Sequence, residues 1–438
     1  MYPSVRLPSS VEEHATLPTS SRRRRVSGNV VALGFTSMFT DISSEMVNAV
    51  LPLYLVFQVG LTPLQFGLFD GFYGAAVVVT AFFGAVLADR LGKYKEIAGC
   101  GYALSALCKI GLVVIRGTGA PIVGVLFVDR CGKGIRTAPR DALISLSSDP
   151  DRLGESFGVH RALDTTGALI GPLVAFAILV AAPGDYQVVF LASFCAAMVG
   201  LCVLALYVGN RAAAPRVADR RGLGAVAGSL WANRTYRMLA AAGFALGMFT
   251  VSDALLFLSV RQRTSLSDQM FTLLPVGTAL VYLLLTVPIG RWADAHGRRA
   301  VYLSGFGVLG GCYVAVLLCG SIVPALLLVA PLGVYYAATD GVLAAIGSAT
   351  LSRNVRAAGL AVLGGSIALG RMVSSATFGF VWGRYGVSEA LLVSLVGLAV
   401  AVVVAARLLR LSGHHPTATP GIVNGPNADN PNCSATAA

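Results

Sequence analysis

Charged residues are scarce in this chain of 438 residues. They make up 12% of it, about half the fraction usual in a soluble globular protein, whereas hydrophobic residues make up 55%. Mean hydropathy is +0.74. Apolar runs such as "VVFLASFCAAMVGLCVLALYVG" are long enough to cross a bilayer as a helix, which takes about 20 residues. The scarcity of charge excludes a soluble globular protein and predicts an all-α polytopic membrane protein.

Motifs of enzyme and metal chemistry are also missing. The sequence has no H-E-x-x-H and no P-loop with G-K-[ST]. The five histidines assemble into no cluster and the eight cysteines include no C-x-x-C pair, so we expect no metal, no cofactor and no disulfide framework. We expect no enzyme activity. Without a nucleotide site, any transport is driven by an ion gradient or is passive.

The net charge of +12 reflects topology rather than nucleic-acid binding. One set of alternate loops carries most basic residues: Arg22 to Arg25, Arg90, Lys93, Lys95, Arg211, Arg216, Arg220, Arg221, Arg298, Arg299, Arg353 and Arg356. The other set carries only Arg116, Arg261, Arg263 and Arg384. The positive-inside rule places the rich loops and both termini in the cytoplasm. The polar first 27 residues show no signal peptide. We therefore expect a bacterial inner (cytoplasmic) membrane protein in contact with membrane lipids.

The chain divides into five predicted regions. They are a basic cytoplasmic tail (1–28), a six-helix bundle (29–209), a basic cytoplasmic linker (210–237), a second six-helix bundle (238–411) and a disordered cytoplasmic tail (412–438). The twelve predicted spans are 29–58, 65–88, 97–115, 121–145, 157–181, 187–208, 238–260, 270–293, 299–319, 323–350, 357–382 and 387–410. The fourth is weak, because only its first half is apolar.

The two sets of six spans resemble each other. "MFTDIS" at 38–43 has a counterpart in "MFTVSD" at 248–253, and "GAVLADRLGK" aligns with "IGRWADAHGR" at an offset of 205. This register superposes Asp89 on Asp294 and Gly92 on Gly297. Two related halves joined by a cytoplasmic linker are typical of alternating access around a central site, so we expect two pseudo-symmetric bundles.

The loop after the second span resembles a motif of the major facilitator superfamily of transporters, G-x-x-x-D-R-x-G-R-K. "ADRLGKYK" supplies Asp89, Arg90, Gly92 and Lys93, although its first glycine comes one residue early and Tyr94 splits the basic pair. The second copy keeps Asp294, Gly297 and Arg298 but lacks the arginine after the aspartate. We expect these loops to form a cytoplasmic charge latch that is made and broken during transport. The alternative is that their charges only fix topology.

Two further elements resemble the same family. "LFVDRCGKGIRTAPRDAL" matches L-x-x-x-R-x-x-Q-G-x-G at Leu126, Arg130 and Gly134, and the resemblance implies a role for Arg130 in proton or substrate coupling. At 1.5 Å per residue, Arg130 lies about 13 Å into the membrane and must face protein or water. "GALIGP" supplies Gly167, Gly171 and Pro172 of an antiporter-associated G-x-x-x-G-P element, which favours export.

Several ionisable side chains lie inside apolar segments. Asp41, Glu45, Asn48 and Pro52 form one stripe on the first helix, at i, i+4, i+7 and i+11. The others are Asp70, Lys109, Arg130, Asp164, Asp253, Asp340 and Arg371. Desolvation raises the pKa of a carboxyl group and a nearby cation lowers it, so the stripe suits a proton relay. A cation-binding stripe, a substrate-binding site or a structural ion pair with Arg130 or Arg371 would use the same residues.

Together these features predict a monomeric, twelve-helix transporter of the major facilitator type that exports small organic compounds in exchange for protons. We expect the proton-coupling and substrate residues to be Asp41, Glu45, Asn48, Arg130, Asp164, Asp253, Asp340 and Arg371. Arg130 would modulate whichever of Asp41 and Glu45 titrates. The alternatives are an importer or uniporter of a polar metabolite and, in another class, a membrane receptor or regulator that does not transport.

Overall fold

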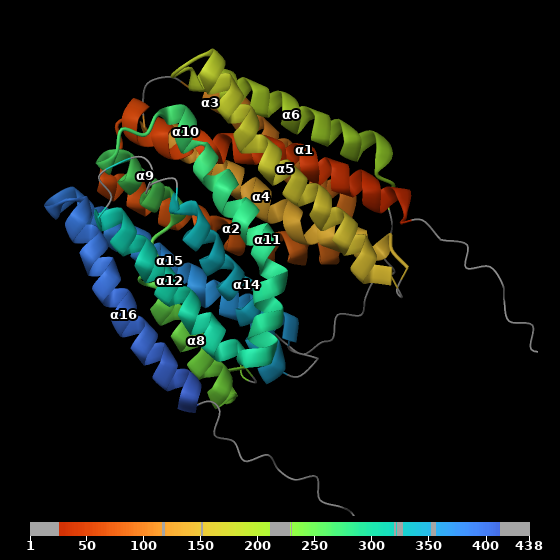
Figure 1. Ribbon diagram of the computed structural model, residues 1–438. Coiled ribbons are helices and arrows are strands. Elements are labelled where there is room, and N and C mark those ends of the chain that lie inside the picture. The colour runs from red at the N-terminus through yellow and green to blue at the C-terminus, as the bar shows by residue number, and fades with distance from the viewer. Residues whose placement is uncertain are drawn as a thin grey trace, which may run out of the picture.

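The chain folds into long helices that lie side by side (Figure 1). The computed structural model describes residues 26–115, 119–149, 152–210, 228, 230–318, 321, 327–351 and 356–411, and these ranges contain no strand. A helix satisfies every backbone hydrogen bond within its own segment, which is what an apolar environment demands. Most of the predicted tails 1–28 and 412–438 and of the linker 210–237 lies outside the described residues.

The residues before the linker, called the N-terminal half below, form long helices with short turns between them. They are α1 (Gly28–Leu53) with a π-helical extension η1 (Tyr54–Gln58), α2 (Pro63–Leu91), α3 (Tyr94–Val114), α4 (Gly119–Leu146), α5 (Leu153–Ala181) and α6 (Tyr186–Tyr207). Within this half α1 packs on α5 and α6, and α4 packs on α2 and α3.

The residues after the linker, called the C-terminal half, form a second series of helices. They are α8 (Arg234–Gly247), α9 (Asp253–Arg263), α10 (Asp268–Phe271), α11 (Leu273–His296), α12 (Arg298–Leu318), α14 (Val329–Thr350), α15 (Arg356–Tyr385) and α16 (Val387–Leu411). Here α14 packs on α11 and α12, and α8 packs on α15 and α16. The bundle boundaries stay a prediction.

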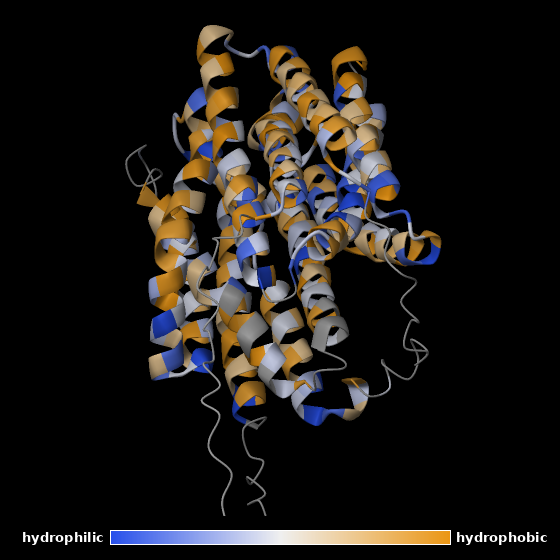
Figure 2. Cartoon of the chain, turned by 90° about the vertical axis from the view of Figure 1, so that its right-hand side faces the viewer, coloured by the Kyte–Doolittle hydropathy of each residue, from blue (hydrophilic) through white to orange (hydrophobic). Residues whose placement is uncertain are grey.

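Hydrophobic residues cover most of the length of the helices (Figure 2). Among the described residues, seven helical segments are long and apolar enough to cross a membrane, by length and composition. The weak fourth span, α4, is not one of them, because its second half carries several charges. The chain is thus an all-α membrane protein, and the count of twelve spans stays a prediction.

The helix breaks in the middle of the predicted span 238–260. The chain leaves α8 at Gly247 and re-enters a helix at Asp253, where the Ser252 side chain accepts a hydrogen bond from the backbone of Leu255. The hydroxyl of Tyr313 accepts a hydrogen bond from the Val251 amide (2.8 Å) and donates one to the Phe249 carbonyl (3.0 Å). Irregular backbone at membrane depth is tolerated where protein groups satisfy it, as they do here.

The turns that carry the family-like loop motif have the conformation that the motif predicts. Gly92 ends α2 with φ of 63° and Gly297 ends α11 with φ of 103°. Both values lie in the region that glycine adopts without steric cost, so the chain reverses within a few residues.

The two halves meet most closely along α2 and α15. A Cβ atom added at Gly67 would lie 2.3 Å from the carbonyl oxygen of Ser375, and one added at Gly379 would lie 2.4 Å from that of Pro63. Only glycine permits backbones this close. The contact lies at the start of α2, at the end of the molecule opposite to Gly28.

Glycines also allow a close approach of α5 to α1. A Cβ atom at Gly167 would lie 2.3 Å from the carbonyl oxygen of Met38, and one at Gly171 would lie 2.7 Å from that of Ile42. Pro172, the next residue, is buried inside α5. The G-x-x-x-G-P element therefore allows α5 to pack closely against α1, the helix that carries the polar stripe.

Candidate functional site

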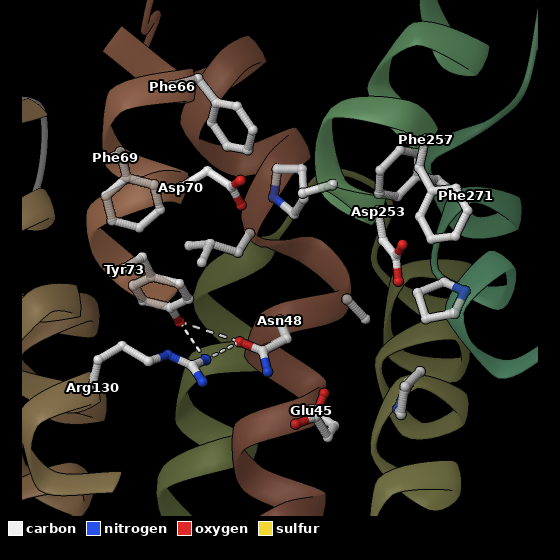
Figure 3. Close-up of a pocket in the computed structure, with 16 residues that line it drawn as sticks. Glu45, Asn48, Phe66, Phe69, Asp70, Tyr73, Arg130, Asp253, Phe257 and Phe271 are labelled. Atoms are coloured by element: carbon white, nitrogen blue, oxygen red, sulfur yellow. Dashed lines mark hydrogen bonds between the residues drawn. The ribbon is translucent and has the colours of Figure 1, made fainter. Parts of the chain in front are cut away.

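A cavity of about 240 Å³ lies between the two halves (Figure 3). Asn48, Tyr73 and Arg130 line it from the N-terminal half, and Asp253 and the ring of Phe257 line it from the C-terminal half. Clefts between two domains of this kind are the usual location of ligand sites. The cavity is the candidate substrate site.

Arg130 is held in this cavity by neutral partners. Its guanidinium group donates hydrogen bonds to the side-chain oxygen of Asn48 and to the hydroxyl of Tyr73, and lies 4.0 Å from the centre of the Tyr73 ring. The hydroxyl of Tyr73 also donates to the same oxygen of Asn48 (3.2 Å). The Nε atom of Arg130 is buried and has no hydrogen-bond partner. The arginine is thus positioned without a carboxylate against it.

The carboxylate next to Arg130 in sequence belongs to a different pair. Asp129 accepts hydrogen bonds from Lys109 Nζ of α3, at 2.6 Å, and from the hydroxyl of Ser105. The side chains of Lys109 and Asp129 are 1% and 4% exposed. A structural ion pair of Arg130 with Asp129 is therefore excluded, and Asp129 fastens α4 to α3 instead.

The polar stripe of α1 faces a matching stripe of cations on α4. Asp41 lies 3.7 Å from Arg136, and Glu45 lies 3.5 Å from Lys133, between carboxylate oxygen and side-chain nitrogen in each case. The two helices run in opposite directions, so the third pair of facing residues is Asn48 with Arg130. The sequence predicts Arg130 as the partner of Asp41 or Glu45, but the contacts give those carboxylates Arg136 and Lys133. We call these three pairs the α1–α4 ladder.

The ladder continues into α5 at the end of the molecule that carries Gly28. Asp41 and Asp164 lie near each other, and Arg140 faces both carboxylates. Arg140 lies 3.6 Å from Asp164, forms a 3.0 Å ion pair with Asp141 and donates a hydrogen bond to Ser37. Two neighbouring carboxylates repel each other when both are ionised.

A buried histidine borders the same group. His160 of α5 is 1% exposed, and neither of its ring nitrogens has a hydrogen-bond partner. Arg136, which is 3% exposed, lies with its guanidinium carbon 4.6 Å from the centre of the Tyr102 ring. Titratable and cationic groups from three helices therefore surround Asp41.

The C-terminal half contributes its own acidic residue to the central cavity. Asp253 is the first residue of α9, immediately after the break in the seventh span, and its carboxylate accepts a 2.7 Å hydrogen bond from Tyr336. The positive end of a helix dipole favours a carboxylate at this position. The break therefore places Asp253 in the cavity wall.

The remaining predicted residues lie in a second cavity, of about 260 Å³, within the C-terminal half. Asp340 of α14 and Arg371 of α15 both line it. Arg371 donates a 3.1 Å hydrogen bond to the hydroxyl of Tyr335. Asp253 and Asp340 thus lie in the walls of two different cavities rather than in one group.

Among the described residues, the hydrogen bonds and ion pairs of the predicted latch residues lie within their own halves. Asp89 accepts a 3.0 Å hydrogen bond from the hydroxyl of Tyr94, and Asp294 forms a 2.7 Å ion pair with Arg298. Arg90 and Lys93 are exposed. Within the described part of the chain no ion pair joins the two loops.

Sequence reasoning missed the tyrosines that orient the two arginines. Tyr73 lies three residues after Asp70 on α2, and Tyr335 lies five residues before Asp340 on α14. A polar aromatic residue one turn from a carboxylate within an apolar helix is the signal that could have identified Tyr73.

Comparison with known proteins accords with this architecture. Residues 33–274 match the family model of the Major Facilitator Superfamily. An uncharacterised MFS-type transporter of Methanocaldococcus jannaschii is 30% identical over 385 residues, which cover 85% of this chain and 93% of the relative.

Solved structures share the fold at low identity. A POT peptide transporter aligns with a TM-score of 0.74 at 15% identity, over 88% of this chain and 94% of that one. A nucleoside transporter aligns with a TM-score of 0.73 at 13% identity, over 87% and 99% of the two chains. The chain therefore belongs to the Major Facilitator Superfamily and is a multi-pass membrane transporter rather than an enzyme.

Proposed function

We propose that the protein is a secondary active transporter that exports small organic compounds by alternating access in exchange for protons. The observation that carries this proposal is the α1–α4 ladder, which runs from the end of the molecule bearing Gly28 to the central cavity. Buried carboxylates with exchangeable cationic partners can gain and lose a proton as their surroundings change. The ladder thus connects the proposed proton-binding residues to the central cavity.

The contacts between the halves support the alternating-access part of the proposal. Tyr186 donates a hydrogen bond to Asp268 (3.1 Å), and Gln269 donates one to the carbonyl of Leu179. Together with Gly67 against Ser375, they join the halves at the end opposite to Gly28. If both termini are cytoplasmic, as the loop charges predict, this end is extracellular and the conformation faces inward.

We assign the coupling proton to Asp41. The groups near it are Asp164 and His160 of α5 and Lys133, Arg136 and Arg140 of α4; Asp141 pairs with Arg140, and Glu45 lies one turn away on α1. The cations Arg136 and Arg140 stabilise negative charge here, while a second carboxylate beside Asp41 favours its protonated form. In this proposal Asp41 carries the proton in this conformation and releases it when α1 separates from α5.

The experiment is transport into proteoliposomes with an internal pH dye and a panel of small organic compounds. We expect substrate movement to be accompanied by proton movement in the opposite direction. Asp41→Asn and Asp164→Asn should abolish uphill transport driven by a pH difference and keep downhill exchange, because each leaves a neutral group. Glu155→Gln, an exposed substitution on α5, is the control.

Three outcomes contradict parts of the proposal. Uphill transport that survives in both aspartate variants would remove the assignment of the proton site. Substrate accumulation with protons moving in the same direction would favour the alternative, an importer of a polar metabolite. Substrate binding without flux would favour a receptor.

A further inference from the structure

We propose that the central cavity binds an organic cation with an aromatic or apolar body. This substrate class rests on the proposed transport function, because it assumes that the cavity between the halves holds the cargo. The inference comes from three features of the cavity wall: its excess of carboxylates, the state of its single arginine, and its aromatic rings.

Carboxylates outnumber cations in the wall. Glu45, Asp70 and Asp253 line the cavity, whereas Arg130 is the one cationic side chain among the described lining residues. Burial of an uncompensated negative charge is costly in a membrane protein, so the excess of carboxylates in the wall favours a positive ligand.

The charged residues that line the cavity differ in whether neighbouring protein groups already neutralise or bind them. Glu45 has Lys133 at 3.5 Å, and Arg130 is bound by Asn48 and Tyr73. Asp70 and Asp253 form no ion pair among the described residues. Their hydrogen bonds come from neutral hydroxyl groups.

The hydroxyl of Ser375 donates to Asp70 (2.7 Å), and that of Tyr336 donates to Asp253 (2.7 Å). Asp70 and Asp253 are therefore the carboxylates that a bound cation would compensate. They lie on opposite halves of the protein and on opposite sides of the cavity (Figure 3).

The aromatic rings suit the same ligand. Phe66, Phe69 and Tyr73 line the cavity from α2, and Phe257 and Phe271 line it from α9 and α10. The negative face of an aromatic ring attracts a cation, and the rings also bury the apolar part of a ligand. An inorganic cation would leave these rings unused.

An anionic ligand fits this wall poorly. The N-terminus of α9 lies in the wall and has the polarity to attract an anion, but Asp253 already occupies it. The Arg130 guanidinium already donates to Asn48 and Tyr73. A further cation, Arg371, lines the second cavity and acts on Asp70 and Asp253 without forming an ion pair with them, so an anion would still approach two carboxylates.

The volume limits the size of the ligand. The volume of about 240 Å³ lies below the usual range for ligand pockets, about 300–1,000 Å³, which favours a cation with one aromatic ring over a large multi-ring compound. Benzyltrimethylammonium has this size and a permanent charge. Phenylmethanesulfonate is its anionic counterpart with the same ring and a similar bulk.

The test is isothermal titration of the purified full-length protein in detergent with these two compounds. We expect the cation to bind and the sulfonate to bind at least tenfold more weakly. Asp253→Asn should weaken binding of the cation at least tenfold, which is about 1.4 kcal/mol, because it removes a charge-assisted contact. Asp253→Glu should retain most of the affinity, because it keeps the charge.

Glu389→Gln, an exposed substitution at the start of α16, is the control for removal of a negative charge far from the cavity. Equal affinity for cation and anion in the unmodified protein would overturn the inference. So would an Asp253→Asn protein that is folded and binds the cation as tightly as the unmodified one. The comparison of the two compounds needs no variant, so the test stands even if a variant fails to fold.

Transport measurements separate this inference from the proposed function. Flux of other solutes by a protein that does not bind benzyltrimethylammonium would contradict the substrate class and leave transport standing. Binding of the cation that depends on Asp253, with no flux of any compound, would contradict transport and support the site.

Discussion

Asp41 on α1 lies 3.7 Å from Arg136 on α4, and this ion pair forms one rung of the α1–α4 ladder. Glu45 with Lys133 forms the next rung, one turn away on each helix. Charged residues recur about once per turn on both helices. Each carboxylate of α1 therefore meets its own cation on α4, although the helices run in opposite directions. The ladder explains how a helix rich in polar residues remains buried next to α4.

The first prediction concerns the stability of this rung. Arg136→Gln leaves Asp41 without its direct cationic partner in a partly buried site. We expect the free energy of unfolding to fall by up to about 3 kcal/mol, because a partly buried carboxylate loses the cation with which it forms an ion pair. Thermal unfolding in detergent measures the loss. The double variant Asp41→Asn with Arg136→Gln should recover part of it, and a double variant less stable than the single one would contradict the pairing.

The second prediction concerns the buried pair of Lys109 and Asp129. Asp129→Asn should lower stability by about 3 kcal/mol for the same reason, yet leave transport per folded molecule unchanged. The double substitution Lys109→Met with Asp129→Leu should restore stability, since apolar residues replace buried ion pairs well. Loss of proton coupling in a stable double variant would show that the pair has a functional role.

The third prediction concerns the close contact of α2 and α15. Gly67→Val would place side-chain atoms where the carbonyl oxygen of Ser375 lies, so the halves could not approach as they do here. We expect the conformational equilibrium to move toward the state open at this end. Labelling of engineered cysteines on both faces measures the shift. Gly74→Val on the same helix is the matched control, because a Cβ atom there has no neighbour within 4 Å.

The fourth prediction concerns the contact of α5 with α1. Gly171→Val should lower the turnover rate more than it weakens substrate binding, because it separates α5 from Ile42 near the ladder. Gly158→Val, also on α5, has open space at its Cβ position and should behave like the unmodified protein. Equal loss of binding and turnover would indicate misfolding or a direct role in the cavity.

The fifth prediction concerns the predicted latch. Asp89→Asn should slow transport and shift the balance between inward and outward states while expression survives, because the charge is lost from the loop. Tyr94→Phe removes the hydrogen bond to Asp89 and keeps the charge, so it should have the smaller effect. Full transport with unchanged cysteine accessibility in Asp89→Asn would remove the latch.

The sequence by itself determined the membrane class, the all-α fold, the family and the polar face of α1. Scarcity of charge and long apolar runs decide the class, because hydrocarbon admits few charges and requires helices. The 3.6-residue period places Asp41, Glu45 and Asn48 on one side of a helix whatever packs against it. The conformation of Gly92 and Gly297 also followed from the local motif.

Only the tertiary structure decided which side chains meet. Apolar helix surfaces resemble one another and the lipid, so the sequence alone does not select the faces that pack. In the packed structure Asp129 forms an ion pair with Lys109, and Arg130 donates hydrogen bonds to Asn48 and Tyr73. Asp164 lies near Asp41. The break before Asp253 likewise depends on a distant residue, Tyr313 of α12, whose hydroxyl satisfies the backbone groups that the helix gives up.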